Sequence, residues 1–251
     1  MTIPDDTNNA HARSSLNGAS KPLLAAVVIA LFVITFVVQA FQIPSGSMEK
    51  TLLIGDYVLV DKVHLAQGGI WNRLMPYREI RRGDIVVFHY PVDPSEHFVK
   101  RVIGLPGDRV RLQEGAVFVN GELLQENYTI HTARTLDYYR DNFPTDMDTT
   151  GNINTGWHSV LARHVEHGEL VVPRDRYFVM GDNRDQSSDS RYWGFVPRQA
   201  IVGQPLVVYL SVKEQPMIGV DGPNEKLVRS AHFMAHFWQF ARWNRMFHLV
   251  R

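Results

Sequence analysis

A serine in a short turn is the strongest candidate for a nucleophile in this chain. Ser47 directly follows Gly46 and comes soon after Pro44. Glycine permits close backbone approach and an unusual φ angle, and proline stiffens the approach to the turn, so the Ser47 hydroxyl would be presented for attack. The pattern differs from the esterase nucleophile elbow, in which glycines stand on both sides of the serine with one residue between. Ser-Gly-Ser alone also occurs in ordinary loops, so a base must be identified.

A serine hydroxyl needs a base, and Lys100 is the only lysine placed within a strongly apolar strand, predicted at 98–105. Because side chains alternate along a strand, the neighbours of Lys100 on its face are apolar, namely Phe98 and Val102. Burial disfavours the charged amine and lowers its pKa, by up to about 3 to 5 units when burial is complete. A neutral Lys100 could then accept the Ser47 proton. The alternatives are a lysine that snorkels from an edge strand, or a histidine base without an identifiable carboxylate partner: His89 or His97.

A dense polar loop could hold the amine of such a lysine. Residues 181–191 follow a predicted strand and precede the apolar segment 192–197. Their carboxylates could suggest calcium, but the EF-hand pattern requires glycine at its sixth position and a bidentate glutamate at its twelfth. This chain has Ser187 and Trp193 there. The loop therefore predicts an internal network of hydrogen bonds and ion pairs.

One long apolar run precedes the candidate serine. It occupies 23–38 with Thr35 as its only polar member, and about 17 to 20 apolar residues suffice to span a bilayer. We expect a transmembrane anchor at 22–41, preceded by a polar tail at 1–21. A cleaved signal peptide is the alternative, because Val-Gln-Ala at 38–40 has suitable small residues. The run is, however, longer than the usual apolar region of about 7 to 15 residues in such peptides.

Downstream of this run the pattern is β. Short β-branched or aromatic segments bounded by turn residues are typical of strands, and they occur at 57–60, 85–88, 98–105, 117–119, 177–180 and 206–209. Asn120-Gly121 is a hairpin signal. We therefore expect a mainly β fold whose core comprises 42–130 and 169–212.

Two stretches break the β pattern. Residues 131–168 are polar, turn-rich and too long for an ordinary connection, so we expect an inserted cap subdomain or loop there. Metal binding by its histidines lacks a matching carboxylate motif: His158, His164 and His167. The tail at 213–251 carries apolar and aromatic residues at helical spacing, interleaved with arginine and histidine. This predicts an amphipathic helix on a bilayer surface, with a helix packed on the domain as the alternative.

The composition fits one anchored globular domain. Lys and Arg number 26 and Asp and Glu number 26, so no electrostatic footprint for nucleic acid is present. The chain has no cysteine, which excludes disulfides, thiolate catalysis and cysteine-ligated zinc. The part that follows the predicted anchor is long enough for one substantial core.

Four blocks of this sequence resemble the bacterial type I signal peptidases in order and spacing. They lie at 44–52, 55–57, 100–108 and 181–191. The resemblance implies a mainly β catalytic core with an inserted cap. The chain departs from the family pattern at Lys50, where the family commonly has proline, and in its single predicted span where some members have two.

The resemblance implies a role for each matching residue. Ser47 is similar to the nucleophile of the family and Lys100 to its general base. Ser45 resembles the side-chain donor that joins the Ser47 backbone amide in the oxyanion hole, and Ser187 the hydroxyl that orients the lysine amine. The implied supporting network contains two acidic and two basic residues: Arg101, Asp182, Asp189 and Arg191. The resemblance implies neither a cofactor nor a metal.

The departure at Lys50 has two interpretations. An ammonium close to Lys100 would help to keep the catalytic amine neutral by repulsion, whereas one that points to the bilayer would attract anionic headgroups. We favour the second, because a flexible side chain so close to the predicted span can reach the membrane interface.

The implied activity is that of a serine endopeptidase that removes signal peptides from exported preproteins through a Ser-Lys dyad. Its implied partners are signal peptides with small residues before the cleavage site, the phospholipid bilayer and, transiently, the secretion machinery. The implied location is the bacterial inner membrane, with a single span and the catalytic domain on the outer side. The alternatives are a related Ser-Lys protease with a specialised substrate, such as a pilin precursor, and a non-catalytic, membrane-tethered β module.

Overall fold

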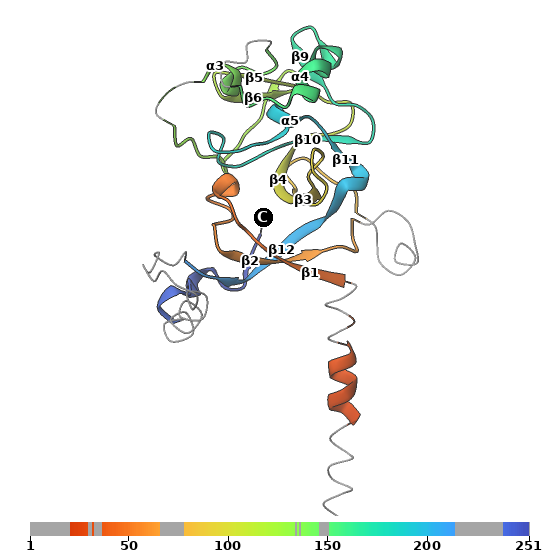
Figure 1. Ribbon diagram of the computed structural model, residues 1–251, viewed down its shortest axis with the longest axis vertical. Coiled ribbons are helices and arrows are strands. Elements are labelled where there is room, and N and C mark those ends of the chain that lie inside the picture. Colours follow the sequence, from red (N-terminus) through yellow and green to blue (C-terminus); the bar gives the residue numbers. More distant parts are fainter. Residues whose placement is uncertain are drawn as a thin grey trace, which may run out of the picture.

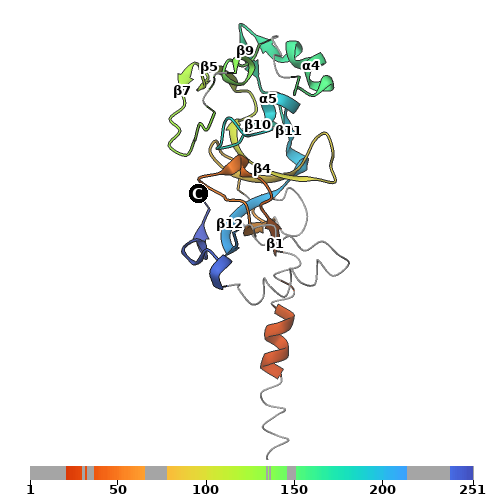
Figure 2. The ribbon, with the colours of Figure 1, turned by 60° about the vertical axis from the view of Figure 1, so that its left-hand side comes forward.

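The structure is a computed structural model that describes residues 21–29, 32, 37–65, 78–133, 135, 137–145, 151–213 and 238–250. Residues 21–29 are helical, and this helix stands clear of the β domain in two views (Figures 1 and 2). Among the described residues, no helix is both long and apolar enough to cross a membrane. Nearly all of the predicted polar tail at 1–21 and part of the predicted anchor at 22–41 lie outside the described residues.

The larger of two sheets has eight strands and carries the candidate site. Its order is β1-β2-β12-β3-β4-β10-β11, with β13 paired to β12, and every pairing between these strands is antiparallel. The prediction of a mainly β fold is confirmed. The strands are β1 (Val38–Gln42), β2 (Asp56–Asp61), β3 (Ile85–His89), β4 (His97–Gly104), β10 (Arg176–Met180), β11 (Val196–Pro197), β12 (Ile201–Ser211) and β13 (His248–Leu249).

A second antiparallel sheet of five strands lies on the side of β4 and β10 that faces away from β1 (Figure 1). Its order is β7-β6-β5-β9-β8. Part of the predicted core thus belongs to this sheet, because β5 pairs with β9 across the predicted 131–168 insertion. The elements here are β5 (Arg109–Gln113), β6 (Ala116–Val119), β7 (Glu122–Leu123), α3 (Tyr138–Asp141), α4 (Thr155–Leu161), η3 (Ala162–His164), β8 (Val165–Glu166) and β9 (Glu169–Val171).

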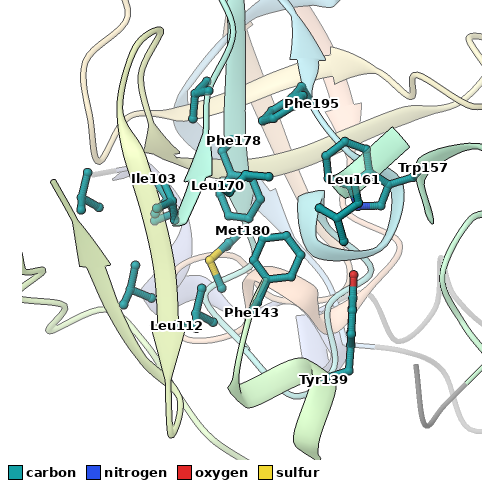
Figure 3. Packing of buried hydrophobic residues seen from close by; sticks show 14 of the residues in the cluster. Ile103, Leu112, Tyr139, Phe143, Trp157, Leu161, Leu170, Phe178, Met180 and Phe195 are labelled. Carbon is teal, nitrogen blue, oxygen red and sulfur yellow. The ribbon is translucent and has the colours of Figure 1, made fainter. Parts of the chain in front are cut away.

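One hydrophobic cluster joins the two sheets. Phe178 of β10 and Phe143 pack at its centre, with ring centroids 5.5 Å apart (Figure 3). Leu112 and Leu170 come from the second sheet, while Trp157 comes from α4. A separate cluster lies between β2, β3 and β12 and includes two residues next to the candidate nucleophile: Met48 and Leu52. The serine turn is therefore packed directly on a buried core.

The end of the long apolar run is a strand. Val38–Gln42 forms β1 and pairs with β2 from Val38 opposite Asp61 to Gln42 opposite Tyr57. The predicted anchor at 22–41 thus runs too far, because its last residues hydrogen-bond to β2. A continuous apolar run does not distinguish a buried helix from a strand by periodicity, so the sequence pattern could not locate this change.

The final described segment also differs from its prediction. Only 238–240 are helical; they are followed by a short 3-10 turn, η5 (Trp243–Arg245), and by β13, which pairs with β12. Arg245 pairs with the buried carboxylate of Asp56. The predicted helix is wrong at 241–250, because strand pairing and this buried charge hold the segment on the sheet. The rest of the predicted tail helix, 214–237, lies outside the described residues.

Candidate active site

Ser47 sits in a 3-10 turn that the core and a neighbouring loop hold in place. The turn, η2, spans Gly46–Met48, and both Ser47 and Met48 are buried. The Ser47 carbonyl accepts a hydrogen bond from the Asn183 backbone amide at 3.1 Å. A Cβ atom on Gly181 would lie 2.4 Å from the same carbonyl oxygen, far inside a van der Waals contact. Glycine at 181 therefore permits the polar loop to press against the serine turn.

Lys100 is the base candidate that reaches the Ser47 hydroxyl. Its Nζ lies 2.8 Å from Ser47 Oγ and 3.2 Å from the Val99 carbonyl oxygen. Strand β4 sets this position, with Lys100 opposite Val86 of β3. The side chain is only 4% exposed, and its Nζ lies 5.2 Å from the centroid of the Phe98 ring. The candidate nucleophile and an amine are thus in direct contact in an apolar setting.

Burial lowers the pKa of Lys100 from 10.5 to about 8, although Asp189 and Asp182 oppose the effect by favouring the ammonium. Desolvation is the dominant cause, since a charged amine loses its water in this site. A sizeable fraction of the amine is therefore neutral in mildly alkaline solution. A neutral amine in contact with a hydroxyl is the arrangement that general-base activation requires.

The two histidines considered as alternative bases make other contacts, although His97 lines the cavity beside Ser47 and Lys100. His89 and His97 face each other with ring centroids 4.4 Å apart, and His89 Nδ1 lies 2.9 Å from the Pro94 carbonyl oxygen. Within the described part of the chain, neither forms a hydrogen bond with Ser47. The geometry therefore favours Lys100 over both as the partner of the hydroxyl.

Two further serines border the pair. Ser45 is exposed, and its Oγ lies 3.4 Å from Ser47 Oγ. Ser187 is buried, and its Oγ makes no hydrogen bond of ordinary geometry among the described residues. It lies close enough to the Asp189 carboxylate to contribute to the lowered pKa of that group. The structure thus brings both serines to the site, without a hydrogen bond between Ser187 and Lys100 in the described part of the chain.

The predicted supporting network separates into two buried ion pairs. Arg101 donates to both oxygens of Asp182 at 2.8 and 2.7 Å, and Arg191 donates to both oxygens of Asp189 at 2.9 and 2.8 Å. The sequence analysis grouped all four together, whereas each guanidinium is matched to its own carboxylate. Burial would raise the pKa of Asp189, but Arg191 outweighs that effect and lowers it.

Thr51 is a site residue that the sequence analysis missed. Its hydroxyl donates to Asp182 Oδ2 at 2.5 Å, and its backbone amide donates to the Met48 carbonyl at 3.1 Å. It therefore connects the serine turn with the Arg101–Asp182 pair. A threonine inside the 44–52 block carries no signal of its own, because only the fold places its hydroxyl beside the carboxylate.

A cavity of about 310 Å³ opens beside Ser47 and Lys100. Its walls are mostly apolar and come from the end of β1 with the residues that follow it, and from the start of β4. The lining residues are Phe41, Gln42, Ile43, Pro44, Ser45, Ser47, Met48, His97, Phe98, Val99, Lys100, Gln186 and Ser188. A mostly apolar cavity with a few polar groups is typical of a ligand-binding site.

Lys50 makes a hydrogen bond that neither interpretation of it predicted. Its Nζ donates to the Asn127 carbonyl, and its backbone has a φ angle of +85°. Proline fixes φ near −65°, so this turn is incompatible with the proline common in the family. The departure is accompanied by a left-handed backbone that lysine tolerates and proline does not.

The described residues contain no group of three histidine, cysteine, aspartate or glutamate side chains that could hold a metal ion. Of the three histidines considered above as metal ligands, His164 stacks on Trp157, with ring centroids 6.1 Å apart. Its aromatic contact with α4 accounts for its position. The described part of the insertion around α4 is therefore packed on the hydrophobic core rather than an open loop.

A model of the signal peptidase family, peptidase S26, matches residues 17–210. The chain belongs to the signal peptidase family. The match confirms the resemblance and the assignment to the serine peptidases of this family, and it includes all four sequence blocks.

Relatives from several bacteria agree with this membership. A signal peptidase I from Pseudomonas aeruginosa is 35% identical over 229 residues, covering 84% of this chain and 78% of the relative. A signal peptidase I from Pseudomonas fluorescens is 36% identical, and the match covers 77% of this chain and 72% of the relative. A probable signal peptidase I-2 from Synechocystis is 37% identical, and the match covers 82% of this chain and 78% of the relative. A crystal structure of a signal peptidase I from Enterococcus faecalis matches with 27% identity and a TM-score of 0.33, over 51% of this chain and 97% of that one.

The depressed pKa of Lys100 predicts a stability cost at neutral pH. Below pH 8 both the folded and unfolded states hold the proton, so the folded state carries a buried ammonium at a cost of about 3 kcal/mol. We expect Lys100→Met to raise the free energy of unfolding at pH 7 by about 1 to 3 kcal/mol. Between pH 8 and 10.5 the unfolded state binds more protons, so wild-type stability rises and the difference narrows.

Urea denaturation at pH 7 and pH 10.5 measures this difference. Exposed Lys213 provides the control, since Lys213→Met relieves no buried charge. A Lys100→Met protein less stable than wild type at pH 7, or a difference that is the same at both pH values, would contradict the prediction.

Proposed function

We propose that this protein is a membrane-anchored serine endopeptidase that removes signal peptides from exported preproteins with a Ser47–Lys100 dyad. The observation that carries the proposal is the 2.8 Å contact between Lys100 Nζ and Ser47 Oγ, with the lysine almost fully buried. A non-catalytic β module would gain nothing from a desolvated lysine, which costs stability. Membership of the signal peptidase family supplies the substrate class.

In the proposed reaction, Ser47 Oγ attacks the scissile carbonyl carbon while Lys100 Nζ takes the hydroxyl proton. The carbonyl oxygen becomes an oxyanion, which the Ser45 hydroxyl and the Ser47 backbone N–H stabilise. Collapse of this intermediate breaks the C–N bond, and the Lys100 ammonium gives its proton to the leaving amine. Water, activated by the neutral Lys100, then hydrolyses the acyl-enzyme and releases the Ser47 hydroxyl.

The open edge of β4 supports substrate binding as an added strand. Pairing between β10 and β4 covers only Arg101 to Gly104, so within the described residues the edge at 97–100 has no strand partner on that side. The end of β1 and the following residues form the opposite wall of the cavity. A peptide laid between them would hydrogen-bond through its backbone and place alternate side chains into the apolar walls.

Ser187 and the two ion pairs are proposed to hold the lysine amine. The Ser187 hydroxyl is buried beside the Asp189 carboxylate, and we propose that it turns toward the amine during the reaction. Arg101 and Arg191 neutralise Asp182 and Asp189. This pairing limits how strongly the two carboxylates favour a charged Lys100.

We infer that the bilayer lies on the β1 and β12 side of the domain. The helix at 21–29 lies on this side (Figure 1), and its exposed side chains include Leu23, Val28 and Ile29. The chain's final segment also exposes large apolar side chains: Trp238, Trp243, Phe247 and Leu249. Tryptophan favours the membrane interface, since it combines an apolar ring with an N–H donor. The proposed location is the outer face of the bacterial inner membrane, with transient contact to the secretion machinery.

Cleavage of a preprotein in detergent tests the dyad. Ser47→Ala and Lys100→Met should each abolish cleavage, since neither group can replace the other and residues that act as a unit lose activity together. Wild-type activity should rise with pH through about 8, because the base must be neutral. Retained turnover in Lys100→Met, together with its loss in His97→Ala, would assign the base to histidine instead.

The orienting role of Ser187 is tested by comparing adjacent serines. Ser187→Ala should slow turnover by roughly 5- to 150-fold, the equivalent of about 1 to 3 kcal/mol for a lost hydrogen bond at a buried amine. Ser188 is exposed, so Ser188→Ala should have a much smaller effect. Equal losses in the two variants, measured as kcat on a short peptide, would remove Ser187 from the proposed mechanism.

Tryptophan quenching tests the membrane-facing side. In nanodiscs whose acyl chains carry bromine, the full-length wild type should be quenched more strongly than the double variant Trp238→Phe, Trp243→Phe. Unbrominated lipid gives the reference for each protein. Equal quenching of the two proteins would place the final segment away from the bilayer.

A further inference from the structure

A buried carboxylate links the serine turn to the end of the chain. Asp56 is fully buried at the start of β2, and it accepts hydrogen bonds from the Leu53 backbone amide at 2.9 Å and from Ser211 Oγ at 2.6 Å. Arg245 Nη2 donates to it at 2.6 Å. Burial alone would raise the pKa of Asp56, but the bonds from Arg245 and Ser211 outweigh burial and lower it. Arg242 Nη2 also lies 3.6 Å from Asp56 Oδ1, so the buried charge of Asp56 is balanced by two arginines of the final segment, Arg245 and Arg242.

The arginines of the final segment also hold the backbone of the turn. Arg245 Nη2 donates to the Thr51 carbonyl at 3.0 Å. Arg242 Nη2 donates to the Ile54 carbonyl and, at 3.1 Å, to that of Val212. Both guanidinium groups are mostly shielded from solvent. Two carbonyls of the 51–56 turn are therefore fixed by charged donors from the far end of the chain.

This turn leads directly to the reacting groups. Thr51 receives Arg245 on its carbonyl, while its hydroxyl donates to Asp182 at 2.5 Å. Asp182 in turn holds Arg101, the neighbour of Lys100 in β4. On the other side, the Thr51 amide is bonded to Met48 at the end of the serine turn. Thr51 thus connects the final segment to Met48, which follows Ser47, and through Asp182 to Arg101, which follows Lys100.

The final segment is itself firmly attached. The Arg242 amide donates to the Ser211 carbonyl at 2.8 Å, and the Phe247 amide donates to the Val208 carbonyl at 2.7 Å. The segment lies beside β12 in both ribbon views (Figures 1 and 2). The family match ends at residue 210, so these arginines stand outside the part of the chain that the family pattern covers.

We propose that Arg245, assisted by Arg242, is a positioning residue for catalysis. It holds the 51–56 turn and, through Thr51, fixes the relative placement of Ser47 and Lys100. The inference rests on the proposed function of this pair. A small misplacement of reacting groups by a distant change can cost about 100-fold in rate, so the loss should appear in kcat rather than in KM.

The test uses the full-length protein in detergent with a short peptide substrate. Arg245→Lys retains a charge for Asp56 but lacks the planar fork that also reaches Thr51, so it should remain folded while kcat falls by about 5- to 100-fold. The kcat of Arg245→Ala should fall further than that of Arg245→Lys. KM should stay within about twofold of wild type, and the midpoint of the pH profile should not move. The control is Arg109→Ala, because Arg109 forms an exposed ion pair with Glu166 on the second sheet; it should keep wild-type kcat.

Wild-type kcat in folded Arg245→Lys would overturn the proposal, and so would a loss that merely follows the fraction of protein that has unfolded in thermal melting. If Arg245→Ala does not melt cooperatively, it is not folded, and the kcat of Arg245→Lys alone decides whether the positioning role holds. The Ser47→Ala variant distinguishes a failure of the proposed dyad from a failure of the positioning role. Cleavage by Ser47→Ala would refute the dyad itself, whereas an inactive Ser47→Ala beside a fully active Arg245→Lys would refute only the positioning role.

Discussion

The site depends on a lysine amine kept out of water. In solution, an amine at neutral pH holds its proton and cannot activate a hydroxyl. Burial on β4 lowers the pKa of Lys100 to about 8 and leaves Ser47 Oγ as its nearest hydroxyl partner at 2.8 Å. Desolvation of a charge is costly, so the fold must supply enough packing elsewhere to maintain it. The cluster that contains Met48 and Leu52 lies directly beneath the serine turn and provides part of that packing.

The carboxylates near this amine would defeat the arrangement if they were unpaired. Asp182 and Asp189 both favour the charged lysine, and both are fully buried. Each is matched by a bidentate arginine, which spreads the carboxylate charge over a fixed ion pair. Such pairs contribute little net stability once desolvation is counted. Their value here is geometric, because they fix the polar loop against the serine turn while leaving the lysine pKa low.

Much of this could be predicted from the sequence, since the strands, Ser47 and Lys100 lie in short segments with strong local patterns. Lys100 stood out as a charge inside an apolar strand. The change from apolar run to β1 was missed, because apolar content alone does not separate a helix from a strand. The final segment was predicted as a helix from its spacing, yet pairing with β12 and the buried Asp56 decide its structure. Such long-range partners leave no trace in local periodicity.

The open edge at 97–100 illustrates how the fold accepts one hazard in order to function. An unpaired strand edge invites association with other chains, and here it lies beside an apolar cavity. The exposed stretch is short, because β10 covers β4 from Arg101 onward, and Lys100 within it points into the site toward Ser47. The edge therefore accepts a few residues of extended peptide next to the nucleophile and offers little to a longer strand. Under the proposed function, the same limit that restrains aggregation would confine cleavage to peptides that can present a short, extended segment.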